Sequence, residues 1–130
     1  MVTVRKLKES DYKLIANWTN EPICKSVYPL DSSYITENDG KPIVIAVCYL
    51  YNTEAYAQIE GLIGNPKASR IERKEASGVL VEKLEDMLKR RGYKRVLCYT
   101  NNKVLENYYA KRFGYKAIIS DLVCLVKEIS

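Results

Sequence analysis

The first half of the chain predicts four strands and one helix from its spacing of apolar and polar residues. Residues 2–7 alternate apolar and basic side chains, which indicates a strand with one wet face. Residues 10–20 begin with a serine N-cap and carry apolar side chains on one helical face. Residues 33–37 favour a brief strand, and the nine apolar residues 43–51 favour a central strand buried on both faces. A tight turn leads into residues 55–63, so the last two strands should form a hairpin.

Alternation within residues 55–63 separates the side chains of this strand into two sets. Successive side chains of a strand point to opposite faces of the sheet, so each set should occupy one face. The first set is Tyr56, Gln58, Glu60 and Leu62, and the second is Ala57, Ile59 and Ile63. The strand should end at Asn65 and Pro66, since proline cannot donate to a strand ladder.

The second half of the chain contains the clearest helix, at residues 73–91. Its apolar residues form a stripe at helical spacing, and Gly92 is a natural stop. The stripe consists of Ala76, Leu80, Leu84, Met87 and Leu88. A strand, a helix and two strands then follow, at residues 96–100, 104–113, 117–120 and 122–129. This order predicts an α/β (α+β) fold, with a mixed sheet that carries helices on both faces.

Composition favours one globular domain over residues 1–130, with 47% hydrophobic and 28% charged residues. No apolar run approaches the ~18 residues of a membrane span, and the N-terminal residues lack the apolar centre of a signal peptide. The four cysteines show no Cys-x-x-Cys spacing, and three of them lie in apolar, strand-like runs. They therefore indicate buried thiols in a reducing cytoplasm, without membrane contact. They are Cys24, Cys48, Cys98 and Cys124.

The chain contains no histidine, which restricts the chemistry open to it. Nucleophile pairs of the Ser-His and Cys-His kind are excluded, as are histidine-based metal sites. The wide spacing of the cysteines also argues against zinc, so we expect no metal. Acid–base chemistry would have to use Glu, Asp, Tyr, Lys, Cys or a water molecule.

The net charge of +5 is concentrated in the middle of the sequence. Residues 1–66 hold six basic and eight acidic residues, whereas residues 67–95 hold ten basic and five acidic ones. A basic segment of this kind suits an anionic partner, either a nucleic acid or a phosphorylated small molecule. The alternative is a solvated helix of mixed charge.

Three motifs resemble the GNAT superfamily of acyl-CoA-dependent N-acetyltransferases over nearly the whole chain. VRKLKESDY at residues 4–12 is similar to the family's opening strand and helix. IEGLIGNP at 59–66 precedes a basic loop and a long helix, as in the family. YTNNKVLENYYAKRFGY at 99–115 resembles its Asn-x-x-Ala-x-x-Leu-Tyr-x-x-x-Gly-Phe segment. LYNT at 50–53 also looks like a small subgroup often encoded by bacteriophages.

The resemblance implies a GNAT-like, mostly antiparallel sheet in which two parallel strands splay apart to admit acetyl-CoA. The backbone of Leu62, Ile63 and Gly64 would bond the pantetheine arm, and Gly61 and Gly64 would leave room for it. Free amides at the start of the long helix would hold the pyrophosphate. The residues assigned to this site are Arg70, Arg73, Lys74, Ala76, Ser77 and Gly78. An ordinary loop without a ligand is the alternative.

The pyrophosphate segment departs from the family pattern of Arg or Gln, two residues, Gly, one residue, and Gly or Ala. The best register is RKEASG at residues 73–78, in which Ala76 replaces the first glycine. Glu72 and Glu75 would repel a pyrophosphate, and nearby basic side chains would offset this repulsion. Because of this altered loop, a GNAT-fold binding module that has lost catalysis is a second possible function.

The resemblance assigns Glu60 as the general base and Tyr109 as the general acid. Burial on an apolar strand would make the Glu60 carboxylate a stronger base, although a solvent-facing Glu60 paired with a lysine is the alternative. Tyr109 stands seven residues after Asn102, as in the family. Tyr108 is the other candidate for the acid, and for both tyrosines the alternative is packing in the core. Asn102 would bond the cofactor arm or cap its helix.

The expected acceptor is a primary amine on a small molecule, a peptide or a modified nucleobase. The acceptor pocket of the family is built by the stretch corresponding to residues 20–39, which varies and so does not identify the amine. A third function, nucleic-acid binding through residues 67–95, lacks a recognised motif and an interleaved aromatic platform. Both a monomer and a homodimer fit the sequence.

Overall fold

The computed structural model describes residues 1–20, 25–50, 56–98, 103–116 and 127. The chain divides into two compact units, Met1–Cys98 and Tyr99–Ser130. The strands predicted at 117–120 and 122–129 lie outside the described residues, apart from residue 127. Cys24, Asn102 and Cys124 lie outside them as well.

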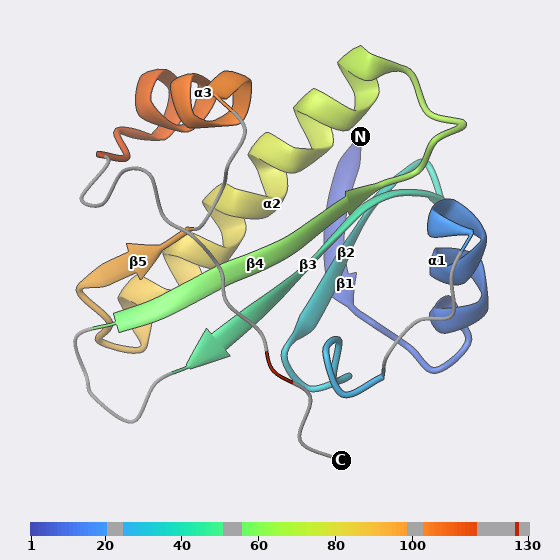
Figure 1. Cartoon of the computed structure of the whole chain (residues 1–130), viewed down its shortest axis with the longest axis horizontal. Helices are drawn as coiled ribbons and strands as arrows, with labels where there is room; N and C mark the ends of the chain where they lie inside the picture. Colours follow the sequence, from blue (N-terminus) through green and yellow to red (C-terminus); the bar gives the residue numbers. More distant parts are fainter. Residues whose placement is uncertain (21–24, 51–55, 99–102, 117–126, 128–130) are drawn as a thin grey trace. The chain divides into compact units, whose positions relative to one another are not determined.

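The first unit is built on a five-stranded sheet in the order β1-β2-β3-β4-β5 (Figure 1). The first four strands are antiparallel to their neighbours, and β5 runs parallel to β4. The strands are β1 (Val2–Lys6), β2 (Ser33–Asn38), β3 (Lys41–Leu50), β4 (Tyr56–Gly64) and β5 (Arg95–Leu97). The predicted mixed, mostly antiparallel sheet is therefore confirmed, and with it the hairpin of β3 and β4.

Helices α1 (Asp11–Thr19) and α2 (Arg70–Arg90) cover opposite faces of this sheet. Strand β3 shows the division, because alternate residues enter different clusters. Val44 and Ala46 pack with the buried residues of α2, whereas Ile45 and Val47 pack with those of α1. The prediction of helices on both faces is confirmed.

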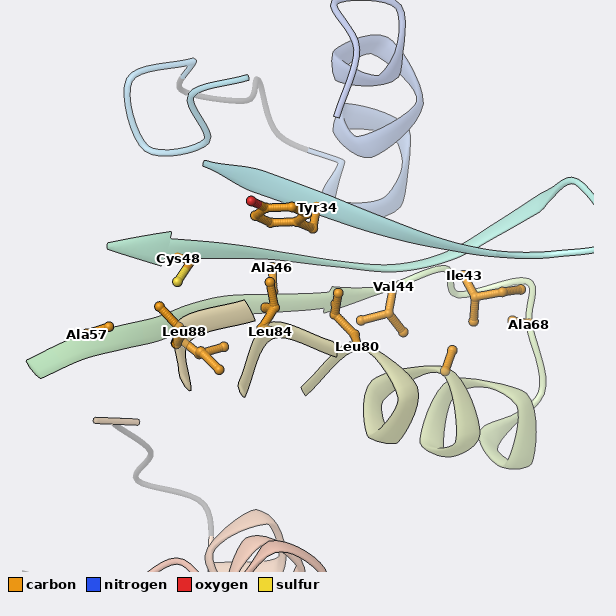
Figure 2. Packing of buried hydrophobic residues seen from close by; sticks show 12 residues of the cluster. Tyr34, Ile43, Val44, Ala46, Cys48, Ala57, Ala68, Leu80, Leu84 and Leu88 are labelled. Atoms are coloured by element: carbon orange, nitrogen blue, oxygen red, sulfur yellow. The ribbon is translucent and has the colours of Figure 1, made fainter. Parts of the chain in front are cut away.

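The α2 face of the sheet holds the larger apolar cluster (Figure 2). Leu80, Leu84 and Leu88 of α2 are at most 1% exposed, and Figure 2 shows them between the helix and the strands. The hydroxyl of Tyr34 on β2 donates to the sulfur of Met87 at 3.2 Å. The predicted apolar stripe of this helix is therefore confirmed as core.

Helix α2 begins at Arg70, three residues before the predicted start, because Ser69 caps it. The Ser69 hydroxyl accepts from the Glu72 amide at 3.1 Å, and the Ser69 amide donates to the Glu72 carboxylate at 3.3 Å. This reciprocal capping box satisfies two of the amides that open a helix. The helix ends at Arg90, and Gly92 follows with φ +90°, as the sequence predicts.

Strand β4 contains a bulge that the alternation did not predict. Its register to β3 passes from Val47↔Glu60 to Ile45↔Ile63, so Gly61 and Leu62 lie opposite one residue of β3. The extra residue reverses the side-chain phase: Leu62 packs in the α2 cluster and Ile63 in the α1 cluster. The predicted faces of Leu62 and Ile63 are therefore wrong.

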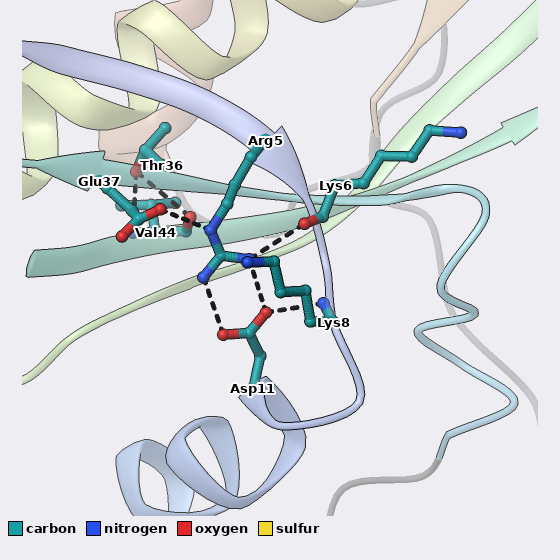
Figure 3. A network of polar contacts seen from close by, with 7 residues as sticks. All are labelled: Arg5, Lys6, Lys8, Asp11, Thr36, Glu37 and Val44. Carbon is teal, nitrogen blue, oxygen red and sulfur yellow. Dashed lines mark hydrogen bonds and ion pairs between the residues drawn. The ribbon is translucent and has the colours of Figure 1, made fainter. Parts of the chain in front are cut away.

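A polar network ties β1, the loop after it, α1 and β2 together (Figure 3). The Arg5 guanidinium donates to both carboxylate oxygens of Asp11, at 2.7 and 2.9 Å, and to Glu37 at 2.5 Å. The Lys8 amide also donates to Asp11, at 2.7 Å. Asp11 therefore anchors the start of α1, and the predicted serine N-cap, Ser10, makes no side-chain cap bond.

The second unit contains one described helix, α3 (Lys103–Phe113). Its aromatic side chains and that of Tyr115 form a cluster, and the ring centroid of Tyr109 lies 5.6 Å from that of Phe113 and 5.5 Å from that of Tyr115. Tyr108 contacts the same rings edge-on. Gly114, with φ +73°, ends the helix close to the predicted position.

Candidate functional site

The parallel strands β4 and β5 pair over a short stretch only. Their register runs from Tyr56↔Arg95 to Gln58↔Leu97 and ends there. From Ile59 to Gly64, β4 has no strand on that side among the described residues. Along this length, no described strand uses the β4 backbone on the β5 side, where an extended ligand could add to the sheet as a strand does.

The bulge of β4 lies in this unpaired length and is packed by Tyr28. Gly61 adopts φ +65°, a conformation that side-chain-bearing residues rarely adopt. A Cβ atom there would lie 2.6 Å from the Tyr28 hydroxyl, which donates to the Gly61 carbonyl at 3.0 Å. At Gly64, a Cβ would lie 2.7 Å from Cδ of Arg73. The expected room beside both glycines is thus filled by the chain's own side chains.

Glu60 lies on β4 immediately before the bulge and is half-buried. It pairs with Val47, whose side chain belongs to the α1 cluster, so Glu60 faces the α1 side of the sheet. Burial raises the pKa of the Tyr28 phenol, and the neighbouring Tyr49 and Glu60 add to the effect. A carboxylate and two phenols therefore lie close together beside the bulge, an arrangement suited to binding and deprotonating a cationic amine.

The N-terminus of α2 offers fewer open amides than the sequence predicts. The Arg73 amide already donates to Ser69 at 3.0 Å within the helix, so the later amides of Ala76, Ser77 and Gly78 are helix-internal. With the capping box closed, the amides of Arg70 and Ile71 are the two at this end without a partner among the described residues.

The side chains of the predicted pyrophosphate segment fall into two groups. Arg70 and Lys74 are exposed, and Ser77 is half-buried, whereas Ala76 and Gly78 are buried against the sheet side of the helix. Arg73 folds back over the β4–α2 loop, where its guanidinium donates to the carbonyls of Ala68 at 2.9 Å and Asn65 at 3.3 Å. This bonding holds the loop that leads into the helix.

The predicted acid lies in the second unit. Tyr109 is buried, at 6% exposure, and Tyr108 is half-buried, both within the aromatic cluster of α3. Asn102 is outside the described residues. Glu60 belongs to the first unit and Tyr109 to the second. Their roles as base and acid stay predictions from the sequence motif.

The thiol and metal chemistry of the described residues is limited. Cys48 is buried on β3, and burial raises the pKa of its thiol to about 11, so the thiolate nucleophile is scarce at neutral pH. Cys98 is half-buried. No three His, Cys, Asp or Glu side chains in the described part of the chain gather into a group that could hold a metal. No helix described is long and apolar enough to cross a membrane.

Sequence reasoning missed Tyr28 and the loop residue Asn65. Asn65 is buried, and its side chain bridges the Pro42 carbonyl at 2.9 Å and the Lys67 amide at 2.9 Å, which shapes the turn into α2. A signal for the bulge was present, because an isolated glycine inside a strand pattern, such as Gly61, indicates a bulge or a close contact. No such signal singles out Tyr28 among eleven tyrosines.

A family model described as "Acetyltransferase (GNAT) family" matches residues 4–115 of this chain. No curated protein matches it in sequence. The match spans the sheet, both covering helices and α3, so it includes every described element except part of β1.

Solved structures share the fold at low sequence identity. A transcriptional regulator from Bacillus halodurans superposes with a TM-score of 0.73 at 17% identity, over 97% of this chain and 100% of its own. The ribosomal-protein-S18-alanine N-acetyltransferase from Escherichia coli gives 0.64 at 16%, over 85% and 76%. N-acetylglutamate synthase from Neisseria gonorrhoeae, complexed with coenzyme A and N-acetyl-glutamate, gives 0.67 at 18%, over 86% of this chain. The matched region is 28% of that enzyme's chain.

Proposed function

Because this chain belongs to the acetyltransferase (GNAT) family, we propose that it transfers an acetyl group from acetyl-CoA to a primary amine. The observation that carries the proposal is the length of β4 from Ile59 to Gly64, which no described strand pairs on the side of the parallel strand β5. It lies directly before the N-terminus of α2, so one extended ligand could contact both. An elongated donor with amide groups and phosphates has the chemistry to use both features.

The donor fits these residues in two respects. The backbone of Leu62, Ile63 and Gly64 would bond the amides of its arm, as a neighbouring strand would. The open amides of Arg70 and Ile71 would receive its phosphates, with the exposed cations of Arg70 and Lys74 beside them. When bound, acetyl-CoA supplies the activated acetyl thioester. Asn102 and Tyr109 remain proposed contacts from the sequence motif.

Glu60 is proposed as the general base. At neutral pH the acceptor amine is protonated to an ammonium. It must lose a proton before its nitrogen lone pair can attack the carbonyl carbon of the thioester. Glu60 would take that proton, directly or through one water molecule. The nitrogen then forms the new C–N bond as the C–S bond breaks, and Tyr109 would donate a proton to the departing thiolate. The half-buried position of Glu60 beside Tyr28 and Tyr49 supports this role.

The acceptor is proposed to be a small amine or an exposed N-terminus. Proteins of this fold are named for different acceptors: an aminoglycoside acetyltransferase was solved with sisomicin, and another enzyme acts on the alanine of a ribosomal protein. These names justify a panel rather than a single choice. The panel would hold an aminoglycoside, L-glutamate, spermidine and a peptide with N-terminal alanine.

The test is release of the CoA thiol from acetyl-CoA in the presence of each amine. We expect at least one amine to raise thiol release above the rate without acceptor, with the acetylated product seen by mass spectrometry. Thiol release that no member of the panel raises, from a protein that does not bind acetyl-CoA, would contradict the proposal.

A second candidate is a binding module that keeps the fold but has lost transfer. The capping box favours it, because Ser69 and Glu72 occupy two helix amides that could otherwise bind phosphate. This candidate predicts weak or absent acetyl-CoA binding and no turnover for any amine. Turnover with one amine rules it out.

A further inference from the structure

Three tyrosine hydroxyls, those of Tyr12, Tyr49 and Tyr28 itself, bond residues 25–30 to α1 and to the sheet. Tyr12 of α1 donates to the carbonyl of Tyr28 at 2.5 Å. Tyr49 of β3 donates to the carbonyl of Val27 at 3.0 Å. The backbone on either side of the Tyr28 ring is therefore held from two elements, which leaves that ring in a fixed place against β4.

Tyr28 and the bulge of β4 fit each other closely. Tyr28 is 7% exposed, and its hydroxyl donates to the Gly61 carbonyl at 3.0 Å. A Cβ at Gly61 would lie 2.6 Å from the hydroxyl and 3.0 Å from two ring carbons. Any side chain at position 61 would therefore displace the ring, as well as strain the backbone at φ +65°.

The hydrogen bond from Tyr28 orients a whole peptide unit. Gly61 and Leu62 stand outside the regular ladder between β3 and β4, where the register skips. In a trans peptide the carbonyl oxygen and the next N–H point in opposite directions, and no described peptide is cis. Fixing the Gly61 oxygen therefore also fixes the direction of the Leu62 N–H, and it restrains the backbone that carries Glu60.

We propose that Tyr28 is a positioning residue for acetyl transfer. Its hydroxyl holds the Gly61–Leu62 peptide and its ring holds the bulge, so that Glu60 on one side and the unpaired β4 backbone on the other keep one geometry. The inference rests on the proposed function. Catalytic groups lose effectiveness steeply when their placement loosens, so this support would be visible in the rate.

The alternative is that Tyr28 only fills space between the loop and the sheet. Tyr28→Phe separates the two roles, because it keeps the ring and removes only the hydroxyl. A packing role predicts a small loss of thermal stability with kcat unchanged. A positioning role predicts that kcat falls while donor binding is preserved.

The matched control is Tyr34→Phe. Tyr34 is also a buried tyrosine with one hydrogen bond, to Met87, but it lies in the α2 cluster and not at the bulge. Both variants lose a single buried hydroxyl, so their stability losses should be alike. Only Tyr28→Phe should change the reaction.

The experiment compares kcat, KM for acetyl-CoA and the Kd for CoA in the wild type and both variants, using the most active amine of the panel. For Tyr28→Phe we expect kcat to fall at least about tenfold, with the Kd for CoA within about twofold of the wild type. We also expect the amide resonance of Leu62 to shift in Tyr28→Phe, because its peptide loses the bond at the Gly61 carbonyl, and to stay in place in Tyr34→Phe.

An active wild type with an equally active Tyr28→Phe would overturn the inference and leave the proposed function standing. So would an unchanged Leu62 amide resonance in Tyr28→Phe, because the hydroxyl would then not hold that peptide. A wild type that neither binds acetyl-CoA nor acetylates any amine would overturn the proposed function, and the inference with it.

Discussion

The carboxylate of Asp11 makes three hydrogen bonds from one position at the start of α1. Arg5 supplies two of them and the Lys8 amide the third, while the Asp11 side chain is 8% exposed. Such charge-assisted bonds are shielded from water, so they stabilise more than a surface ion pair does. One carboxylate thus joins the first strand to the first helix.

Replacing Asp11 tests this anchor. Asp11→Asn weakens the two bonds from Arg5, and we expect it to lower the free energy of unfolding by about 1–3 kcal/mol in a urea titration. Asp39→Asn is the control, because Asp39 pairs with the N-terminus in an ion pair that is almost fully exposed. It should cost less than about 0.5 kcal/mol. Equal losses of unfolding free energy in the two variants would show that the Asp11 bonds stabilise the fold no more than an exposed ion pair does.

The same residue predicts a pH dependence. The hydrogen bonds from Arg5 lower the pKa of Asp11 below its ordinary value of 3.8. A carboxyl whose pKa is lower in the folded state stabilises the protein above its unfolded value, and this stability is lost as the pH falls through the folded one. Stability should therefore fall below about pH 4, and less steeply in Asp11→Asn. Parallel pH profiles of the two proteins would contradict this.

Glu60 carries the proposed base chemistry. Glu60→Gln removes the proton acceptor and keeps the shape, so we expect kcat to fall by about 10²-fold or more, and the rising limb of the pH–rate profile to shift or disappear. The Kd for acetyl-CoA should stay near that of the wild type. Asp86→Asn, an exposed change of the same charge on α2, is the control. Normal acetylation by Glu60→Gln would move the base to a water molecule or another residue.

At the scale of elements, the capping box of α2 competes with an anion. Glu72 takes the Ser69 amide and places a negative charge at the helix N-terminus, where Lys41 approaches it at 3.7 Å. The bond to the Ser69 amide lowers the pKa of Glu72, so it is charged at neutral pH. The capping box stabilises the first turn of the helix, and the Glu72 carboxylate would repel the phosphates of a donor.

Glu72→Gln separates these two effects, since glutamine also completes a capping box. We expect the variant to bind acetyl-CoA about two- to fivefold more tightly by calorimetry, because the repulsion is gone. Asp86→Asn again serves as the control, since it removes one negative charge far along the same helix. Weaker or unchanged binding by Glu72→Gln would place the phosphates away from this helix end.

Most elements could be predicted from the sequence because their patterns are local. The apolar stripe of α2 indicates a helix, and the apolar run of β3 indicates a strand. Neither depends on contacts with distant residues. Alternation alone did not place the bulge of β4, although the isolated Gly61 signals one, and so Leu62 and Ile63 were assigned to the wrong faces. The start of α2 was missed by three residues because the capping box at Ser69 precedes the apolar stripe.

The candidate site was predictable only in part, for a related reason. Glu60 and the end of β4 lie in a segment that resembles the family, so the sequence singles them out as candidates, and their roles stay predictions. Tyr28 acts through contacts with residues 33 positions away, such as its bond to Gly61, and no local pattern reveals such a partner. Arg73 was assigned to phosphate from its position in the motif, whereas its guanidinium bonds the carbonyls of the preceding loop.

Taken as a whole, the molecule shares its fold with proteins whose sequences differ greatly from its own. Structures of this fold share 12–19% identity with it and are named for different activities. What is common to them is the backbone arrangement, and the acceptors that some of the names give differ. Neither the fold nor the family motif therefore predicts which amine this chain would accept.

We propose that acetyl-CoA binds to the N-terminus of α2 and to the length of β4 that no described strand pairs on the β5 side. Calorimetric titration of the protein with acetyl-CoA, and separately with CoA, tests this binding without knowledge of the acceptor. We predict saturable binding of both ligands at micromolar Kd, and weaker binding at high salt because phosphates contribute. No heat of binding at millimolar ligand would contradict the claim.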